Sequence, residues 1–241
     1  MFLESKKTIL SLCALSIGMM FSQSNYASIV LNGTRVIYQG SKNEVTVSLT
    51  NNNPRPVLVQ SWIDAGNETK TPEKISVPFV LTPPINRVDA NKGQTIRISY
   101  TGVPALPTDK ESVYWLNVLE VPAKDKASGE IKQKLNVVFR TRIKLFYRPD
   151  GLEGDSNEAP DALHWQLNNQ NVTVKNDSKY NITIFKINYK DKSITSEIDG
   201  EMLAPGELHK FALKNTGNID GLTFSTINDY GALIHHKARA E

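Results

Sequence analysis

The histidines are the natural starting point for chemistry in this sequence, and they indicate no catalytic or metal site. None of the four, His164, His209, His235 and His236, is spaced from another histidine, a cysteine or a carboxylate as metal ligands are. His235 and His236 are adjacent, so in a strand they point to opposite faces, and we interpret them as surface or tail residues. No Gly-x-Ser-x-Gly elbow, His-Glu-x-x-His pair or phosphate-binding glycine loop occurs. The pattern favours binding over catalysis and implies no metal or cofactor, although a triad set by geometry leaves no such motif.

Two cations in apolar strands, Arg35 and Lys144, are stronger candidates for a binding site. Arg35 lies in the stretch Gly-Thr-Arg-Val-Ile-Tyr, and Lys144 lies in Ile-Lys-Leu-Phe-Tyr. A cation among apolar residues is isolated unless it faces a cleft. Two fixed cations suit one carboxylate, because hydrogen bonds to charged groups contribute ~1.5–3 kcal/mol each. A solvated surface position is the alternative interpretation for each of them.

The run that contains Lys144 also has an alternating apolar face, formed by Leu135, Val137 and Phe139. If this run is an edge strand, its unpaired backbone groups invite another chain, and each buried side chain would contribute ~1.5–3 kcal/mol. The alternative is that the three residues are ordinary core. Strict alternation places Lys144 on the opposite face, so one partner would reach both faces only across a bulge or a strong twist.

The elements that must position these residues are predicted to be strands. Period-two alternation and strand-forming residues occur in the segments 45–49, 57–63, 95–100, 171–175, 182–187, 208–213 and 222–227. Turn signals separate the strands of the first half at 51–54, 64–67, 82–84 and 91–93, a spacing typical of a sandwich or barrel. No helix of several turns is predicted.

Residues 1–27 are predicted to be a secretory signal peptide. A positively charged start precedes the apolar run 9–21 and a polar stretch that ends at Ala27, after which we place the cut. A signal anchor is the alternative, but the run is shorter than the roughly 20 residues of a transmembrane helix. No later stretch is apolar enough to span a membrane. The chain is therefore predicted to be exported to the periplasm.

The remaining chain suits two domains of roughly 100 residues each. A polar segment with glycine and proline, 149–160, separates the two halves, so we predict domains at 28–148 and 149–241. The only cysteine, Cys13, lies in the signal, which leaves the exported protein without a disulfide. The net charge is +3, and no dense cluster of lysine and arginine with interleaved aromatics indicates nucleic-acid binding.

The stretch from Leu106 to Pro122 resembles the signature of the periplasmic pilus chaperones, the PapD-like family of the chaperone–usher pathway. It reads Leu-Pro-Thr-Asp-Lys-Glu-Ser-Val-Tyr-Trp-Leu-Asn-Val-Leu-Glu-Val-Pro. The segments 33–38, 78–84, 142–149 and 227–232 are similar to other parts of that family. The resemblance covers the exported chain and is densest in its first half. It implies an all-β fold of two immunoglobulin-like β-sandwich domains, set in an L or boomerang around a cleft.

The resemblance also implies roles for the residues already singled out. Arg35 and Lys144 would anchor the C-terminal carboxylate of a bound pilus subunit. The strand with Leu135, Val137 and Phe139 would complete the subunit's incomplete sandwich, which is donor-strand complementation.

Four further residues receive structural roles from the resemblance. Glu111, Arg148 and Asp229 would form an inter-domain ion network that holds the cleft angle; the alternative is three unrelated surface charges. Pro56 corresponds to a cis proline of the family.

The implied partners are pilus or fimbrial subunits and an outer-membrane usher, with no nucleic acid and no membrane insertion. The exposed edge would also allow two copies of the free chain to pair through it, as a self-capping dimer. One alternative is that the chain is itself an adhesin or a structural pilus subunit. Another is an enzyme or a carbohydrate-binding module that uses Trp62, Trp115 and Trp165 as a sugar platform, although we interpret these tryptophans as core.

Overall fold

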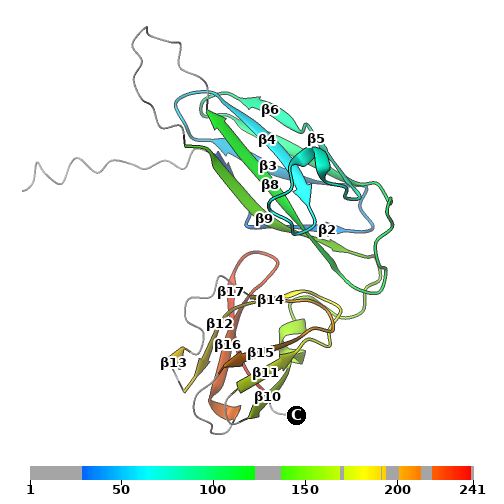
Figure 1. Ribbon diagram of the computed structural model, residues 1–241, viewed down its shortest axis with the longest axis vertical. Helices are drawn as coiled ribbons and strands as arrows, with labels where there is room; N and C mark the ends of the chain where they lie inside the picture. Colours follow the sequence, from blue (N-terminus) through cyan, green and yellow to red (C-terminus); the bar gives the residue numbers. More distant parts are fainter. Residues whose placement is uncertain are drawn as a thin grey trace, which may run out of the picture.

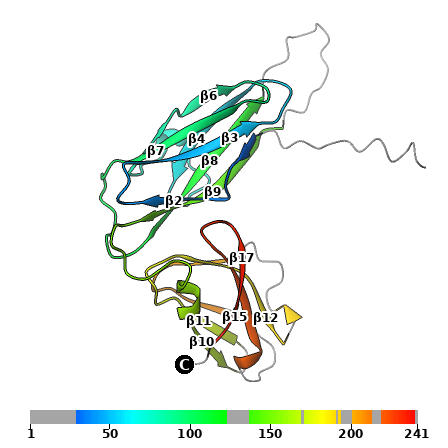
Figure 2. The ribbon, with the colours of Figure 1, turned by 180° about the vertical axis from the view of Figure 1, so that it is seen from behind.

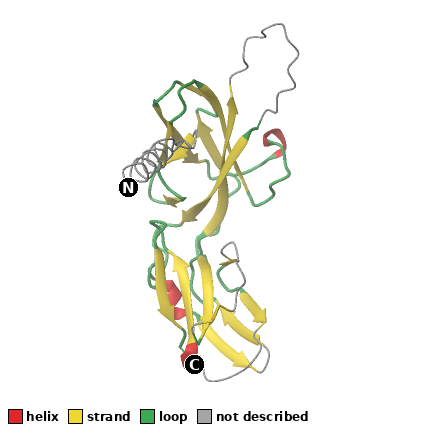
Figure 3. Ribbon diagram, turned by 90° about the vertical axis from the view of Figure 1, so that its left-hand side faces the viewer, coloured by secondary structure: helices red, strands yellow, loops and turns green. Residues whose placement is uncertain are grey.

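The computed structural model describes residues 29–122, 137–168, 171–190, 192–193, 201–212 and 219–239. The predicted signal peptide, with its cut after Ala27, lies outside these residues, as does Cys13. Nearly every ordered element in them is a strand (Figure 3). The short 3-10 helices are η1 (Pro72–Lys74), η2 (Ala159–Ala162) and η3 (Ile219–Gly221). Among the described residues, no helix is long and apolar enough to cross a bilayer.

The first domain is a sandwich of two sheets. One sheet has the order β1 (Ile29–Leu31), β3 (Glu44–Asn51), β7 (Gly93–Tyr100) and β5 (Phe79–Thr82). The other has the order β2 (Arg35–Gln39), β9 (Phe139–Arg148), β8 (Ser112–Pro122), β4 (Val57–Asp64) and β6 (Ile85–Val88). The chain thus changes sheets between β1 and β2. Only the β2–β9 pair is parallel among the ladders of this domain.

The alternation predicted from the sequence selects the side chains that fill this sandwich. In β3, Val47 and Leu49 are buried while the residues between them are exposed. Leu116 of β8 and Leu145 of β9 are fully buried in the same core. Burying such side chains is the main favourable contribution to folding, at ~1.5–3 kcal/mol for each.

The second domain is a smaller sandwich with its own core. One sheet contains β10 (His164–Asn168), β11 (Asn171–Lys175) and β15 (Leu208–Ala212). The other contains β13 (Lys192–Ser193), β12 (Ile182–Tyr189), β16 (Leu222–Ile227) and β17 (Leu233–Lys237), with β14 (Glu201–Leu203) also on β12. Trp165 is buried between the sheets against Phe224, with ring centroids 4.8 Å apart. Two separate cores confirm the predicted all-β fold of two sandwiches.

The two sandwiches lie one beyond the other at an angle, which gives the chain a bent shape (Figures 1 and 2). The hairpin between β16 and β17 reaches from the second domain towards β2 and β9 of the first in both views. Arg35 donates a hydrogen bond to the carbonyl of Ile227 at the base of this hairpin, at 2.9 Å. The face of the β2–β9 pair therefore meets the second domain at the bend.

The prediction of a cis bond before Pro56 is wrong. Among the described residues, the cis peptide bonds are Thr82–Pro83 and Val103–Pro104, and the bond between Arg55 and Pro56 is trans. The expectation depended on likeness to a family position, because the general frequency of cis bonds before proline is only ~5–6%.

Candidate functional site

Arg35 and Lys144 are direct neighbours on the parallel strands β2 and β9. The residues that follow them, Val36 and Leu145, point into the core, so both cations point out of the opposite face, towards the second domain. Arg35 Nη1 donates to the Ile227 carbonyl at 2.9 Å, and Lys144 Nζ donates to Thr183 Oγ1 at 3.2 Å. The structure thus brings together two residues that lie far apart in the sequence.

The two cations are partly buried and have only neutral hydrogen-bond partners among the described residues. Burial lowers the pKa of Lys144 to about 8, and the positive charge of Arg35 acts in the same direction. Burial also lowers the pKa of Arg35, although the carboxylates of Asp229 and Glu111 act against it. The Nε of Arg35 is buried without a hydrogen-bond partner. A carboxylate placed here would relieve the repulsion between the cations.

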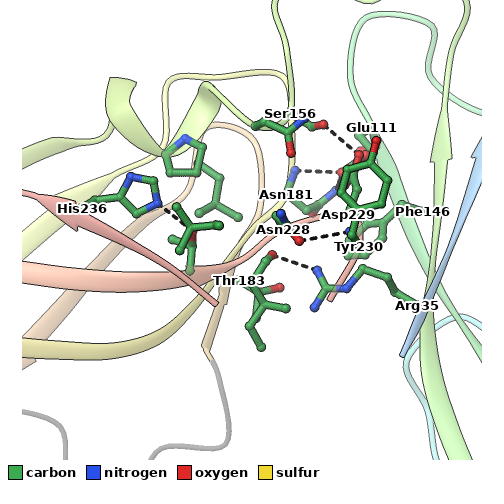
Figure 4. A pocket seen from close by; sticks show the side chains of 16 residues that line it. Arg35, Glu111, Phe146, Ser156, Asn181, Thr183, Asn228, Asp229, Tyr230 and His236 are labelled. Carbon is green, nitrogen blue, oxygen red and sulfur yellow. Dashed lines mark hydrogen bonds between the residues drawn. The ribbon is translucent and has the colours of Figure 1, made fainter. Parts of the chain in front are cut away.

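A cavity of about 320 Å³ opens beside Arg35 at the junction of the domains (Figure 4). Arg35 and Phe146 line it from the first domain, and Thr183, Tyr230 and His236 are among the residues that line it from the second. Its wall combines hydroxyl and amide groups with apolar side chains, and it also includes the carboxylates of Glu111 and Asp229, which belong to the Arg148 network described below. This cleft can therefore admit a short segment of another chain together with its charged end.

Arg148 joins the two domains through an ion network at the edge of the cleft. Arg148 Nη2 lies 2.8 Å from Glu111 Oε1, and Arg148 Nη1 lies 2.9 Å from Asp229 Oδ2. The second domain adds the Asn181 backbone N–H, which donates to Glu111 Oε2 at 2.9 Å. Ser156 Oγ donates to Asp229 Oδ2 at 2.9 Å. The sequence indicated no role for Asn181 or Ser156, because neither residue lies in a motif.

The Arg148 network is electrostatically complementary. Burial alone would lower the pKa of Arg148, but the two neighbouring carboxylates raise it above its usual value. The side chain of Glu111 is 1% exposed, and this guanidinium and the two Asn181 donors supply its hydrogen bonds. We propose that the network holds the angle between the domains, the role that the resemblance implied.

Strand β9 has a partner on both sides over only half of its length. Residues 144–147 pair with β8 and with β2, whereas residues 139–143 pair with β8 alone among the described residues. Next to this free half-edge, Phe139 is 65% exposed and Val137 is 53% exposed. Leu135, the third residue of the predicted apolar face, lies outside the described residues.

The ladder shows no bulge between Phe139 and Lys144, one of the two features that would bring them to the same face. The ladder between β8 and β9 runs without a register shift from the pair Glu120–Phe139 to the pair Ser112–Tyr147. Phe139 and Lys144 therefore lie on opposite faces of one regular strand. Both faces of the strand are accessible from its free edge.

The interpretation of all three tryptophans as core is right for Trp165 and wrong for Trp62 and Trp115. Trp62 and Trp115 are half-buried on the outer face of the β2–β9–β8–β4–β6 sheet. The guanidinium of Arg140 lies 5.2 Å from the Trp62 ring centroid, and that of Arg142 lies 4.7 Å from the Trp115 centroid. No shared platform for a sugar exists, because two rings are covered by arginines and the third is in a different core.

The histidine at 236 is not a surface or tail residue. Its side chain is 6% exposed and stacks on Phe224 at 4.9 Å. Its Nδ1 lies 2.8 Å from Asp161 Oδ1, and its Nε2 lies 2.9 Å from Thr226 Oγ1. In the described part of the chain, no group of three or more histidine, cysteine, aspartate or glutamate residues could hold a metal ion.

Comparison with known proteins identifies what this architecture is similar to. Residues 28–153 match the family model "Pili and flagellar-assembly chaperone, PapD N-terminal domain", and residues 158–238 match "Pili assembly chaperone PapD, C-terminal domain". The probable fimbrial chaperone YadV of Escherichia coli K12 is 43% identical over 99% of this chain and 100% of its own length.

Solved structures agree with the sequence comparison. The Pseudomonas aeruginosa CupB2 chaperone has a TM-score of 0.73 at 33% identity, covering 88% of this chain and 100% of its own. A chain of the Salmonella enterica SafA pilin–SafB chaperone complex has a TM-score of 0.73 at 25% identity, covering 89% of this chain and 98% of its own.

Proposed function

The chain belongs to the PapD family of pilus-assembly chaperones, and from that premise we propose how it captures its subunits. In the periplasm, the free half of β9 pairs with an incomplete fimbrial subunit, and Arg35 and Lys144 bind the subunit's C-terminal carboxylate. The complex is then delivered to an outer-membrane usher. This role is one of binding and transfer, with no reaction step, nucleotide or metal.

The observation that carries this proposal is the point at which the free edge of β9 ends. Strand β2 starts at Arg35, opposite Lys144, and runs parallel to β9. A strand added along residues 139–143 in the same direction would end where β2 begins. Its terminal carboxylate would then lie beside Arg35 and Lys144, so a free chain end would define the register of pairing.

The apolar side chains beside the free edge provide the second part of the binding energy. Phe139 and Val137 are exposed in the free chain, where a soluble monomer would ordinarily protect an edge with charges. Inserted into the core of an incomplete sandwich, each would contribute ~1.5–3 kcal/mol. Leu135 is proposed to act in the same way. A self-capping dimer through this edge stays a prediction.

The SafA–SafB complex supports a partner of this kind, because there a pilin is bound to a chaperone of similar fold. Export to the periplasm, with the signal cut after Ala27, is part of the proposal and agrees with the matched family.

Periplasmic co-purification tests the proposal. We would express the chain with fimbrial subunits encoded beside it and compare the wild type with Arg35→Ala/Lys144→Ala. The matched control is Arg87→Ala/Lys92→Ala, which removes two exposed cations from the same domain. We expect a one-to-one complex for the wild type and the control and none for the cleft variant, with all circular dichroism spectra unchanged. Normal recovery with the cleft variant would contradict the anchoring role, and no complex with any variant would contradict the chaperone role.

A further inference from the structure

The free half of β9 has less backbone support than the rest of the strand. Residues 139–143 have a hydrogen-bonded neighbour on one side only among the described residues, and such half-paired segments open at low free-energy cost. A frayed strand is a poor template, because each binding event must first order its backbone, at roughly 1–2 kcal/mol per residue. On the outer face of the sheet, a set of side chains joins this half of β9 to the neighbouring strands.

Arg142 extends from the free half of β9 across β8 to β4. Its Nη2 lies 2.8 Å from Asp64 Oδ1, its Nε lies 3.2 Å from Asp64 Oδ2, and its Nη1 lies 2.8 Å from Glu68 Oε1. The guanidinium crosses β8 over the ring of Trp115, 4.7 Å from its centroid. Because Asp64, Trp115 and Lys144 are cross-strand neighbours in one row, this contact spans three strands. A bidentate pair of this kind fixes direction as well as distance.

Arg140, two residues before Arg142, also extends its side chain across β8 towards β4. Its Nη2 and Nε donate to Asn117 Oδ1 at 2.6 and 2.9 Å, and its Nη1 donates to the Glu68 carbonyl at 3.0 Å. Its guanidinium lies 5.2 Å from the Trp62 ring centroid. Asn117 in turn donates to Asp64 Oδ2 at 2.7 Å. Arg140 and Arg142 therefore converge on one buried acceptor group.

Asp64 is the centre of this arrangement. Its side chain is 2% exposed, and the backbone N–H of Gly66 donates to it at 2.7 Å. Burial would raise the pKa of Asp64, but the hydrogen bonds from Arg142, Asn117 and Gly66 hold it below its usual value. A buried carboxylate with this many donors has little freedom to release either arginine.

We propose that Asp64, Asn117, Arg140 and Arg142, with Trp62 and Trp115, form a guanidinium clamp that holds the free half of β9 extended for strand addition. The clamp grips β9 from its outer face. It leaves the free backbone edge and the side chains of the other face, Val137 and Phe139, unoccupied. These are positioning residues: they act on the partner through the β9 backbone. The inference rests on the proposed function, since it concerns how the same strand captures a subunit.

The placement of the clamp distinguishes it from general stabilisation. The arginines project from residues 140 and 142, within the half of β9 that lacks β2. Both side chains are engaged within the chain by hydrogen bonds. A free edge and a fixed strand are thereby combined in one segment.

Amide hydrogen exchange on the free, full chain tests the clamp without any partner. The variant is Asp64→Asn/Arg140→Gln/Arg142→Gln, which removes the charges together and leaves no buried charge unpaired. The matched control is Arg87→Gln/Asp89→Asn, an exposed ion pair of the same domain, 3.0 Å long. We expect exchange at residues 139–143 to become at least tenfold faster in the clamp variant, with residues 144–148 unchanged. Should the triple variant fail to fold, Arg140→Gln alone, which keeps the Arg142–Asp64 pair, is measured in the same way.

The second measurement is the rate of association with the fimbrial subunit that the wild type co-purifies with. We expect it to fall at least tenfold in the clamp variant, with dissociation changed less than twofold, because preorganisation acts before binding. Unchanged exchange at 139–143, or an equal rise throughout the domain, would refute the clamp. A change confined to dissociation would also refute it, since the arginines would then contact the partner. If the wild type captures no subunit, the proposed function fails, while the exchange result still decides the clamp.

Discussion

Raising the pH should weaken subunit capture through the titration of Lys144. Burial and the neighbouring Arg35 lower the pKa of Lys144 to about 8 in the free chain. A bound carboxylate favours the charged amine and raises this pKa. Only protonated Lys144 offers its full attraction, so affinity is complete well below pH 8 and declines as the pH rises through that value. The direction is opposite to that of a depressed carboxyl group, whose interaction is lost on acidification.

The size of the effect follows from the fraction of free Lys144 that is protonated. With a pKa of about 8, that fraction falls about tenfold between pH 7 and pH 9. The dissociation constant should rise by the same factor as long as the bound pKa lies well above 9. Below pH 7, Lys144 is already charged, and the affinity should be flat.

The assay is interferometry of the immobilised chain with a synthetic peptide of the captured subunit's last strand, ending in a free carboxylate. Lys144→Arg is the matched variant, because arginine stays protonated across this range, and it should show no decline up to pH 9. The same peptide with an amidated end should bind weakly and without this pH dependence. A similar decline in wild type and Lys144→Arg would place the titrating group elsewhere and refute the reasoning.

Two further predictions concern the junction of the domains. Arg148→Ala should lower the free energy of unfolding by about 3 kcal/mol in urea titration, since it leaves a buried carboxylate without its guanidinium. The control, Arg87→Ala at an exposed position, should change it by less than about 0.5 kcal/mol. Equal losses would contradict the structural role of the network. Gly231 and Gly206 have φ angles of 81° and 80°, so alanine at either should cost about 1–2 kcal/mol. Gly231→Ala should cost clearly more, because its Cβ would lie 2.5 Å from Thr34 Oγ1 in the first domain, whereas nothing lies within 4 Å at Gly206; matching melting temperatures would contradict this.

Much of the strand content is predictable from local alternation. The predicted segments 57–63, 171–175 and 222–227 coincide with β4, β11 and β16 to within a residue. Local alternation predicts strands because successive side chains point to opposite faces, and in a sandwich one of these faces is buried in the core. The same alternation placed Lys144 opposite Phe139, and the unbroken β8–β9 ladder keeps them so.

Alternation does not say what covers a face, and the failed predictions for Trp62, Trp115 and His236 share this cause. Trp62 and Trp115 were interpreted as core because they are apolar, yet they lie under Arg140 and Arg142 on the outer face of the sheet. His236 was interpreted as a surface or tail residue because it is adjacent to His235 and shows no metal-ligand spacing, yet Phe224 covers it. Covering groups come from other strands and loops, and no local pattern reports them.

The sequence by itself determined the two β-sandwiches, their likeness to the pilus chaperones, and the residue types available for binding a carboxylate and an apolar groove. Tertiary structure alone decided that Arg35 stands beside Lys144, that β2 leaves half of β9 unpaired, and that Arg148 meets Asp229 across the bend. The physical reason is the separation along the chain over which each feature is determined. Side-chain alternation depends on the two-residue repeat of one strand, whereas a free edge and a pair of cations depend on which distant strands become neighbours.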